Sequence, residues 1–240
     1  YEAVGYTAPR VADTLPQDIR ARAALMPYAE ALLQIHFPDN QELLTAARKR
    51  IAFDELLLMQ LGIRRQRAEW QSAAGQPLVA ADEALNALIA SLPYALTKAQ
   101  QRALADIRSD VAKSVPMNRL LQGDVGSGKT VVAALTMAIA VQSGAQAALM
   151  APTSILAEQH YRTIKSQIPN PKFQIALLLG ATPDSEKQII YDGLRAGSIH
   201  VVIGTHALIQ DRVEFANLGL IVMDEQHRFG VAQRAKLRRK

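Results

Sequence analysis

The sequence contains no cysteine, which excludes disulfide bonds and thiolate metal sites and suits a reducing, cytoplasmic environment. It also contains no apolar run of about 18 residues, the length that a membrane-spanning helix needs. The first ten residues show no signal peptide, and the chain starts with Tyr1 rather than methionine. We therefore expect a soluble, cytoplasmic protein without a membrane partner, and we expect the chain to begin inside a longer protein.

The overall composition is ordinary for a globular protein, since 49% of the 240 residues are hydrophobic and 20% are charged. The charge, however, is uneven along the chain. Residues 1–92 carry 9 Lys/Arg and 11 Asp/Glu, whereas residues 93–240 carry 18 and 11. Residues 228–240 hold six basic residues and no acidic one. A basic excess suits a polyanionic partner, although a solvated helix face would explain the same charge equally well.

Residues 1–92 are predicted to form an α-helical connector region. Its longest helix is indicated by Leu44, Ile51 and Leu58, which recur every seven residues, and Gly62 is where that helix could end or bend. Pro93 stops the last helix, so we place the domain boundary there. The expected helices are Ile19–Leu25, Ala29–Ile35, Asn40–Trp70 and Asp82–Leu92.

Residues 93–240 alternate between helix-type and strand-type patterns. Strands that alternate with helices predict a parallel, doubly wound sheet of the α/β class, with ligands at the carboxyl ends of the strands. The expected strands are 118–122, 147–150, 173–179, 200–203 and 218–223, and the expected helices are 97–110, 131–141, 153–168 and 185–195.

A phosphate-binding loop is the strongest motif of this second part, and its pattern is Gly-x4-Gly-Lys-Thr. Glycines let the loop direct its N–H groups at phosphate oxygens, and the following helix adds its positive N-terminal end. Lys129 is expected to reach the β- and γ-phosphates of ATP, and the Thr130 hydroxyl is expected to bind Mg²⁺. The alternative is a glycine turn with an exposed lysine. The loop comprises Gly123, Asp124, Val125, Gly126, Ser127, Gly128, Lys129 and Thr130.

Two acidic residues follow the strand-like run 218–223, and both fit the chemistry of a bound nucleoside triphosphate. Asp224 is expected to hold Mg²⁺ opposite Thr130, directly or through water. Glu225 is expected to orient or deprotonate the attacking water, so Lys129 and Glu225 are the predicted catalytic residues. A helix cap is the alternative for such a pair.

The motif Asp224-Glu225-Gln226-His227 resembles that of the DEAH-type superfamily 2 helicases. Together with the loop at 123–130 it resembles the RecG family of bacterial ATP-dependent branched-DNA helicases. The resemblance covers nearly the whole chain, including segments 35–38, 53–56, 96–100, 151–160 and 204–208. It implies that Gln100 reads the adenine base and that His227 couples the nucleotide and DNA surfaces. It also implies DNA contacts at Pro152, Thr153, Gly204, Thr205 and His206.

What the resemblance implies for the whole protein is a RecA-like P-loop NTPase domain, incomplete here, that uses ATP and Mg²⁺ to remodel stalled forks and Holliday junctions. The family's next motif, its second RecA-like lobe and its wedge domain are missing from this sequence. We therefore expect a helicase fragment that binds nucleotide but hydrolyses it slowly at best. Two alternatives stay open: a translocase similar to the transcription-repair coupling factor, and an isolated nucleotide-binding module without turnover.

Overall fold

The computed structural model describes residues 7–168 and 173–230. The chain divides into two compact units between Ser72 and Ala73. The first unit is helical and contains η1 (Ala8–Arg10), α2 (Gln17–Arg22), α3 (Tyr28–His36) and α4 (Gln41–Ser72). No helix in the described part of the chain is long and apolar enough to cross a membrane.

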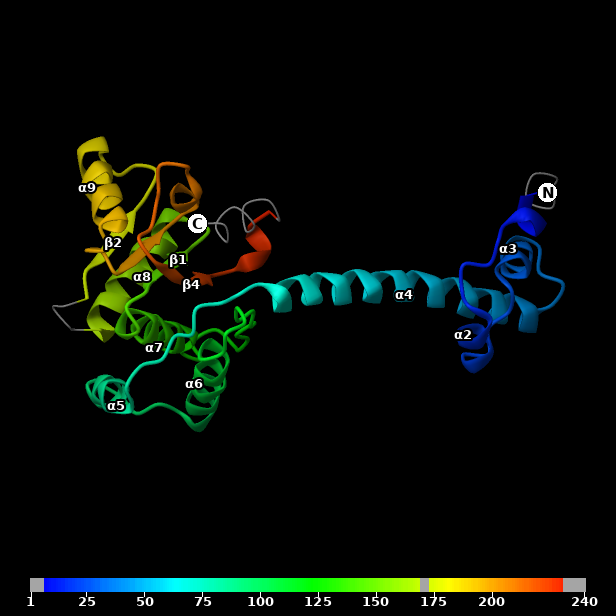
Figure 1. The fold of residues 1–240 in the computed structure, drawn as a ribbon, viewed down its shortest axis with the longest axis horizontal. Helices are drawn as coiled ribbons and strands as arrows, with labels where there is room; N and C mark the ends of the chain where they lie inside the picture. The colour runs from blue at the N-terminus through cyan, green and yellow to red at the C-terminus, as the bar shows by residue number, and fades with distance from the viewer. Residues whose placement is uncertain (1–6, 169–172, 231–240) are drawn as a thin grey trace. The chain divides into compact units, whose positions relative to one another are not determined.

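Helix α4 is the long helix that the seven-residue repeat predicted. Its start is capped by Asn40, whose side chain accepts from the Leu43 N–H at 2.8 Å. Gly62 neither ends nor interrupts it, since the helix runs on through 32 residues. Helix α3 packs against its first part (Figure 1). Farther along, Leu58 is 70% exposed, whereas Leu44 and Ile51 are partly buried and the buried residues of α4, Ala47 and Arg50, lie near its start.

Arg50 on α4 is fully buried and holds the first unit together. Its guanidinium donates to both carboxylate oxygens of Asp13, at 2.6 and 3.0 Å, and to the carbonyl oxygen of Met26 at 2.9 Å. It also pairs with Asp54 at 3.2 Å, one helical turn along α4. A buried charge is tolerated only when its hydrogen bonds are satisfied, so this network fixes the segment before α2 and the start of α3 onto α4.

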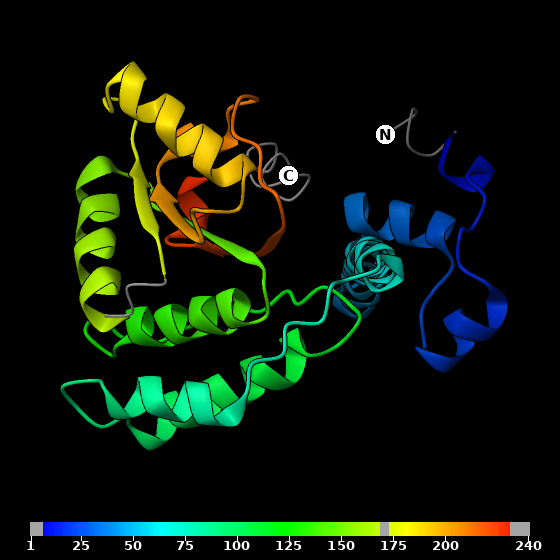
Figure 2. The same cartoon turned by 60° about the vertical axis from the view of Figure 1, so that its left-hand side comes forward.

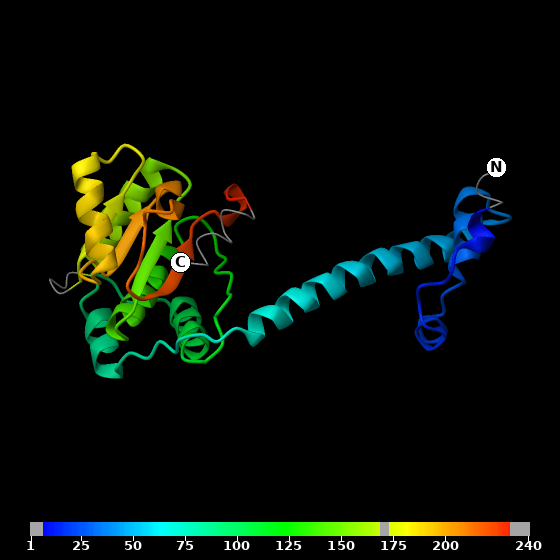
Figure 3. The same ribbon diagram turned by 45° about the horizontal axis from the view of Figure 1, so that its top comes forward.

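The second unit is built on a four-stranded parallel sheet in the order β2-β3-β1-β4 (Figure 3). Its strands are β1 (Gln146–Met150), β2 (Ile175–Leu178), β3 (Val201–Gly204) and β4 (Leu218–Met223). Its helices are α5 (Asp82–Ala90), α6 (Lys98–Val111), α7 (Lys129–Gln142), α8 (Ser154–Gln167) and α9 (Asp184–Arg195), with short turns η2 (His206–Ile209) and η3 (Gln226–Arg228).

Helices cover both faces of this sheet, as expected for strands that are apolar throughout. Ala147 and Leu149 of β1 point into a core shared with α6, α7 and α8. Ala148 and Met150, which alternate with them, point into a second core shared with α9. Figure 2 shows α7 and α9 on opposite sides of the sheet. The predicted α/β class with a doubly wound parallel sheet is therefore confirmed.

One predicted strand is wrong, because residues 118–122 form no strand in the structure. The run contains Leu120 and Leu121, but strand β4 is at the edge of the sheet and pairs only with β1 among the described residues. The outer edge of β4 is open to a partner, but the run does not pair with it, and Leu120 stays 66% exposed.

The helical segment before residue 93 packs with the second unit. Leu78, Leu85 and Leu92 are buried in the same core as α7. The two units thus divide at Ser72, earlier than the change of sequence pattern near Pro93. Residues 73–92 therefore pack with the second unit, and the domain boundary at residue 92 stays a prediction.

Candidate functional site

The phosphate-binding loop has the glycine geometry that its sequence requires. Gly126 and Gly128 have φ values of 81° and 77°, in the left-handed region that favours glycine. The Ser127 N–H donates to the Asp124 carbonyl at 3.2 Å and closes the turn between them. Gly128 is the N-cap of α7, so the loop leads directly into the N-terminus of a 14-residue helix. Such an N-terminus attracts anions.

Lys129 is folded back onto this loop. Its ammonium donates to the carbonyl oxygens of Gly123 and Asp124, each at 2.7 Å. A phosphate bound in the loop would offer charged oxygens in place of these neutral acceptors. Hydrogen bonds between charged groups are shorter and stronger than those to neutral carbonyls, so the exchange is favourable.

The loop lies at the carboxyl edge of the sheet, which follows from the connection between α7 and β1. Helix α7 ends at Gln142, and only three residues separate it from Gln146, the amino end of β1. Since α7 packs along β1 and β4 and is about 21 Å long at 1.5 Å per residue, its first residue lies at the opposite end of the strands. Lys129 and Thr130 therefore face the edge where the strands terminate.

Gln100 connects the start of α6 to the phosphate-binding loop. Its Oε1 accepts from the Thr97 N–H at 2.8 Å, and the Thr97 hydroxyl accepts from the Gln100 N–H, forming a capping box. Its Nε2 donates to the Ser127 carbonyl at 2.9 Å. A Cβ atom added at Gly128 would lie 2.3 Å from that nitrogen. Both polar ends of the amide are thus engaged, and adenine recognition by Gln100 stays a prediction.

The strand ends that carry the other predicted site residues are linked by backbone hydrogen bonds. The Ala151 N–H donates to the Gly204 carbonyl at 2.8 Å, and the Asp224 N–H donates to the Met150 carbonyl at 2.9 Å. These bonds join the carboxyl ends of three neighbouring strands of the sheet, β3, β1 and β4. The segments that begin at residues 151, 204 and 224 therefore lie at one edge, as the parallel topology predicted.

The residues predicted to contact DNA differ in their exposure. Thr153 follows Pro152 and caps α8, since its hydroxyl accepts from the Leu156 N–H at 3.3 Å. His206 is exposed, but Thr205 is 4% exposed, so its side chain lies inside the protein. A Cβ atom at Gly204 would lie 2.2 Å from the Leu178 carbonyl oxygen, so this glycine is required by the packing of β2 on β3. DNA contact by these residues stays a prediction.

Asp224 and Glu225 occupy the end of β4 as predicted, and each has a partner. One carboxylate oxygen of Asp224, Oδ2, lies 2.8 Å from His160 Nε2. Glu225 pairs with Arg228 at 2.9 Å and has a φ of 47°, an unusual backbone conformation for a residue other than glycine. The side chain of His227 lies outside the described part of the structure, so its coupling role stays a prediction.

The oxygen donors fit a magnesium ion that is shared with phosphates. Within the described residues, no hydrogen bond engages the Thr130 hydroxyl or the second carboxylate oxygen of Asp224. No group of three or more His, Cys, Asp or Glu side chains in the described ranges could hold a metal by itself. Magnesium bound through a hydroxyl, one carboxylate, water and phosphate oxygens needs no such cluster.

His160, like Arg228, is a member of this constellation to which the sequence assigned no role of its own; the signal for His160 can be traced. The available signal was its position, since residues 157, 160 and 164 share one face of α8 and Ala157 and Ile164 are buried. A polar residue on the buried side of a helix needs a partner. Nothing in the sequence identifies that partner as Asp224.

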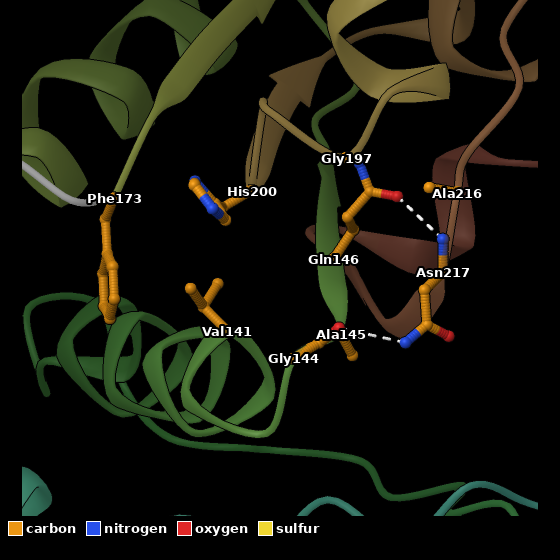
Figure 4. A pocket seen from close by; sticks show the side chains of 9 residues that line it. All are labelled: Val141, Gly144, Ala145, Gln146, Phe173, Gly197, His200, Ala216 and Asn217. Atoms are coloured by element: carbon orange, nitrogen blue, oxygen red, sulfur yellow. Dashed lines mark hydrogen bonds between the residues drawn. The ribbon is translucent and has the colours of Figure 1, made fainter.

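Two cavities among the described residues of the second unit lie away from this edge. One, of about 310 Å³, lies at the amino ends of the strands, next to Gln146, His200 and Asn217 (Figure 4). The Gln146 amide is satisfied there, because it donates to the carbonyls of Leu194 and Ile199 and accepts from the Asn217 N–H. This cavity therefore lies at the opposite end of the strands from the phosphate-binding loop.

Comparison with known proteins gives consistent matches. Residues 97–240 match the model of the DEAD/DEAH box helicase family. The chain is 49% identical over 228 residues to the ATP-dependent DNA helicase RecG of Thermotoga maritima, covering 95% of this chain and 29% of that protein. It is 44% identical over 240 residues to the RecG of Bacillus subtilis, covering all of this chain and 35% of that protein. The chain thus spans about a third of the length of these curated relatives.

Two solved structures support the fold. A structure of RecG bound to a three-way DNA junction matches with a TM-score of 0.85 and 46% identity, over 95% of this chain and 31% of the matched chain. The UvsW helicase from bacteriophage T4 matches with a TM-score of 0.50 over 66% of this chain and 55% of the matched one, at 15% identity, and supports the fold alone.

Proposed function

Because the chain belongs to the DEAD/DEAH box helicase family, we propose that it forms the ATP-binding part of a helicase that acts on branched DNA. The observation that carries this proposal is the meeting of two sites at one sheet edge. Lys129 and Thr130 begin α7 at the carboxyl ends of the strands, and Asp224 and Glu225 directly follow β4 at the same edge. This is where open parallel sheets bind their ligands.

In this proposal the chain holds the triphosphate by its loop and its lysine. The N–H groups of residues 126–130 and the ammonium of Lys129 bind the β- and γ-phosphate oxygens. The Thr130 hydroxyl and the Asp224 carboxylate hold magnesium, which when bound neutralises charge on the phosphates. Glu225 accepts a proton from the attacking water, and Arg228 holds its carboxylate in place from 2.9 Å away.

The DNA part of the proposal rests on the similarity to RecG proteins and on the same sheet edge. We propose that Thr153, at the start of α8, and His206, after β3, contact phosphates of the DNA backbone without reading sequence. The curated RecG relatives are about three times as long as this chain, and a RecG structure was solved with a three-way DNA junction. We infer that the remaining length supplies a second lobe and the junction-binding part, and that the protein is cytoplasmic.

The test is ATP hydrolysis with Mg²⁺, measured for the 240-residue chain and for the full-length protein, each with and without forked DNA. We expect DNA-stimulated turnover in the full-length protein only, because the proposed second lobe would supply an arginine to the γ-phosphate, and such an arginine is worth ~10³–10⁵ in rate. Full-length protein without DNA-stimulated turnover would contradict the helicase proposal. DNA-stimulated turnover by the 240-residue chain alone would contradict the proposal that its active site is incomplete. Nucleotide binding without turnover in both the 240-residue chain and the full-length protein would favour a nucleotide-binding module.

A further inference from the structure

A histidine holds the carboxylate that is proposed to bind magnesium. His160 Nε2 and Asp224 Oδ2 are 2.8 Å apart, and the two side chains are 15% and 34% exposed. An ionised carboxylate can only accept hydrogen bonds, so Nε2 is the ring nitrogen that carries the proton. The histidine therefore engages one carboxylate oxygen and leaves Oδ1 to face other ligands.

Both ends of this contact are anchored on β1. The Asp224 N–H donates to the Met150 carbonyl, which fixes the start of the acidic segment beside the last residue of β1. The same strand continues through residues 151–153 into α8, which carries His160. Ala157 and Ile164, each 0% exposed, fix the face of α8 on which His160 lies. The orientation of the imidazole is thus set by packing, which is what a positioning group requires.

The contact also connects the two proposed sites of this chain. Thr153 caps α8 at its N-terminus and is a predicted DNA contact, whereas His160 lies two turns along the same helix. A shift of α8 on the sheet would move His160 relative to Asp224. A hydrogen bond to a metal-binding carboxylate orients it, and the loss of such a bond typically lowers metal affinity 10–100-fold.

We propose that His160 is a positioning residue that orients the Asp224 carboxylate for magnesium and links it to the DNA-facing helix α8. This rests on the proposed function, because it takes Asp224 as a magnesium ligand. The role needs a donor that reaches as far as Nε2 of histidine. Glutamine places an amide nitrogen at nearly the same distance from its Cβ atom, whereas asparagine is one methylene shorter.

This difference in reach gives a matched pair of variants, H160Q and H160N. The experiment measures binding of a fluorescent ADP analogue to the full-length protein across a magnesium titration and in EDTA. For H160N we expect the magnesium concentration at half-maximal stimulation of binding to rise about tenfold, with H160Q within about twofold of the wild type. Binding in EDTA and the thermal unfolding midpoint should be unchanged in both variants. Ser166→Ala, exposed on the same helix, is the control for effects on α8 itself.

The outcomes separate this inference from the function on which it rests. Equal magnesium midpoints for H160N and the wild type would overturn the role of His160, while the nucleotide site stands. An H160Q midpoint raised as much as that of H160N would also overturn it, because the donor would then not be the important feature. Wild-type binding that does not depend on magnesium, or that D224N leaves unchanged, would overturn the proposed metal site and this inference with it.

Forked DNA provides a second measurement of the same link. If α8 carries the effect of DNA to Asp224, DNA should lower the magnesium midpoint of the wild type and of H160Q. It should not change the midpoint of H160N. A DNA-induced change of equal size in all three proteins would overturn the proposed link to α8.

Discussion

The Gln100 side chain donates from Nε2 to the Ser127 carbonyl at 2.9 Å, so the start of helix α6 is directly bonded to the phosphate-binding loop. The same side chain closes the capping box with Thr97. One residue thus stabilises a helix start and the loop beside which a nucleotide base is proposed to bind.

Replacing Gln100 by alanine should weaken both structures. Loss of the capping box and of the bond to Ser127 should cost about 1–2 kcal/mol of stability. If Gln100 also reads adenine, the affinity for ATP should fall more than the affinity for GTP, as measured by competition against a fluorescent nucleotide. Thr97→Ala is the control, because it removes the cap but keeps the Gln100 amide. An equal fall for both nucleotides would limit Gln100 to supporting the loop.

Glu225→Gln should separate binding from turnover. The amide keeps the shape of the side chain but cannot take a proton, so hydrolysis by the full-length protein should fall about 10²–10⁴-fold. Binding of ATP, measured in parallel by equilibrium fluorescence, should change little. Turnover equal to that of the wild type would show that another group activates the water.

The first unit should lose stability in acid because of Asp13. The Arg50 guanidinium, hydrogen-bonded to this carboxylate, holds the pKa of Asp13 far below its ordinary value. A lowered pKa stabilises the folded state at pH values above the unfolded pKa of about 4, and this stabilisation is lost as the pH falls toward the folded pKa. In urea unfolding followed by circular dichroism, Asp13→Asn should be less stable than the wild type at neutral pH. The difference should shrink as the pH falls below about 4.

The control for this prediction is Asp18→Asn. Asp18 pairs with Arg22 at 2.9 Å, but both side chains are largely exposed, so the pair contributes little. Its removal should leave stability and its pH dependence almost unchanged. If Asp13→Asn and the wild type lost equal stability between about pH 6 and pH 3, the Arg50 network would not hold this unit together.

Ala24→Gly should stabilise the first unit. Ala24 follows the end of α2 and has a φ of 48°, a conformation that costs a residue with a Cβ atom about 1–2 kcal/mol. After the entropy that glycine loses on folding, a gain of up to about 1 kcal/mol should remain. Thermal or urea unfolding would measure it. Ala23→Gly, at a φ of −90°, should destabilise instead, and a loss of stability in Ala24→Gly would contradict the argument.

The sequence was sufficient to predict a site where its residues are close together in the chain. The loop at 123–130 and the acids at 224 and 225 are continuous patterns, and parallel topology alone brings their strand ends together. It was insufficient where contacts join distant residues. His160 and Asp224 are 64 positions apart, and Arg50 and Asp13 are 37 apart, so only the packed structure reveals either pair.

The wrong strand at 118–122 has the same origin. Leu120 and Leu121 give the run the local preference for a strand, but a strand also needs a paired neighbour. In the described structure the run does not pair with β4, the strand at the open edge of the sheet. The local preference of these residues for a strand was therefore not enough to form one.

The most direct test of the central claim is equilibrium binding of ATP with magnesium to the wild type and to Lys129→Ala. The ammonium of Lys129 is already held at the loop by Gly123 and Asp124, and charge-assisted bonds to phosphate are worth ~1.5–3 kcal/mol. We predict a loss of affinity of about 10- to 100-fold, whereas Lys113→Ala, which removes a lysine paired with Asp110, should bind as the wild type does. Equal affinity of Lys129→Ala and the wild type would contradict a nucleotide site at this loop.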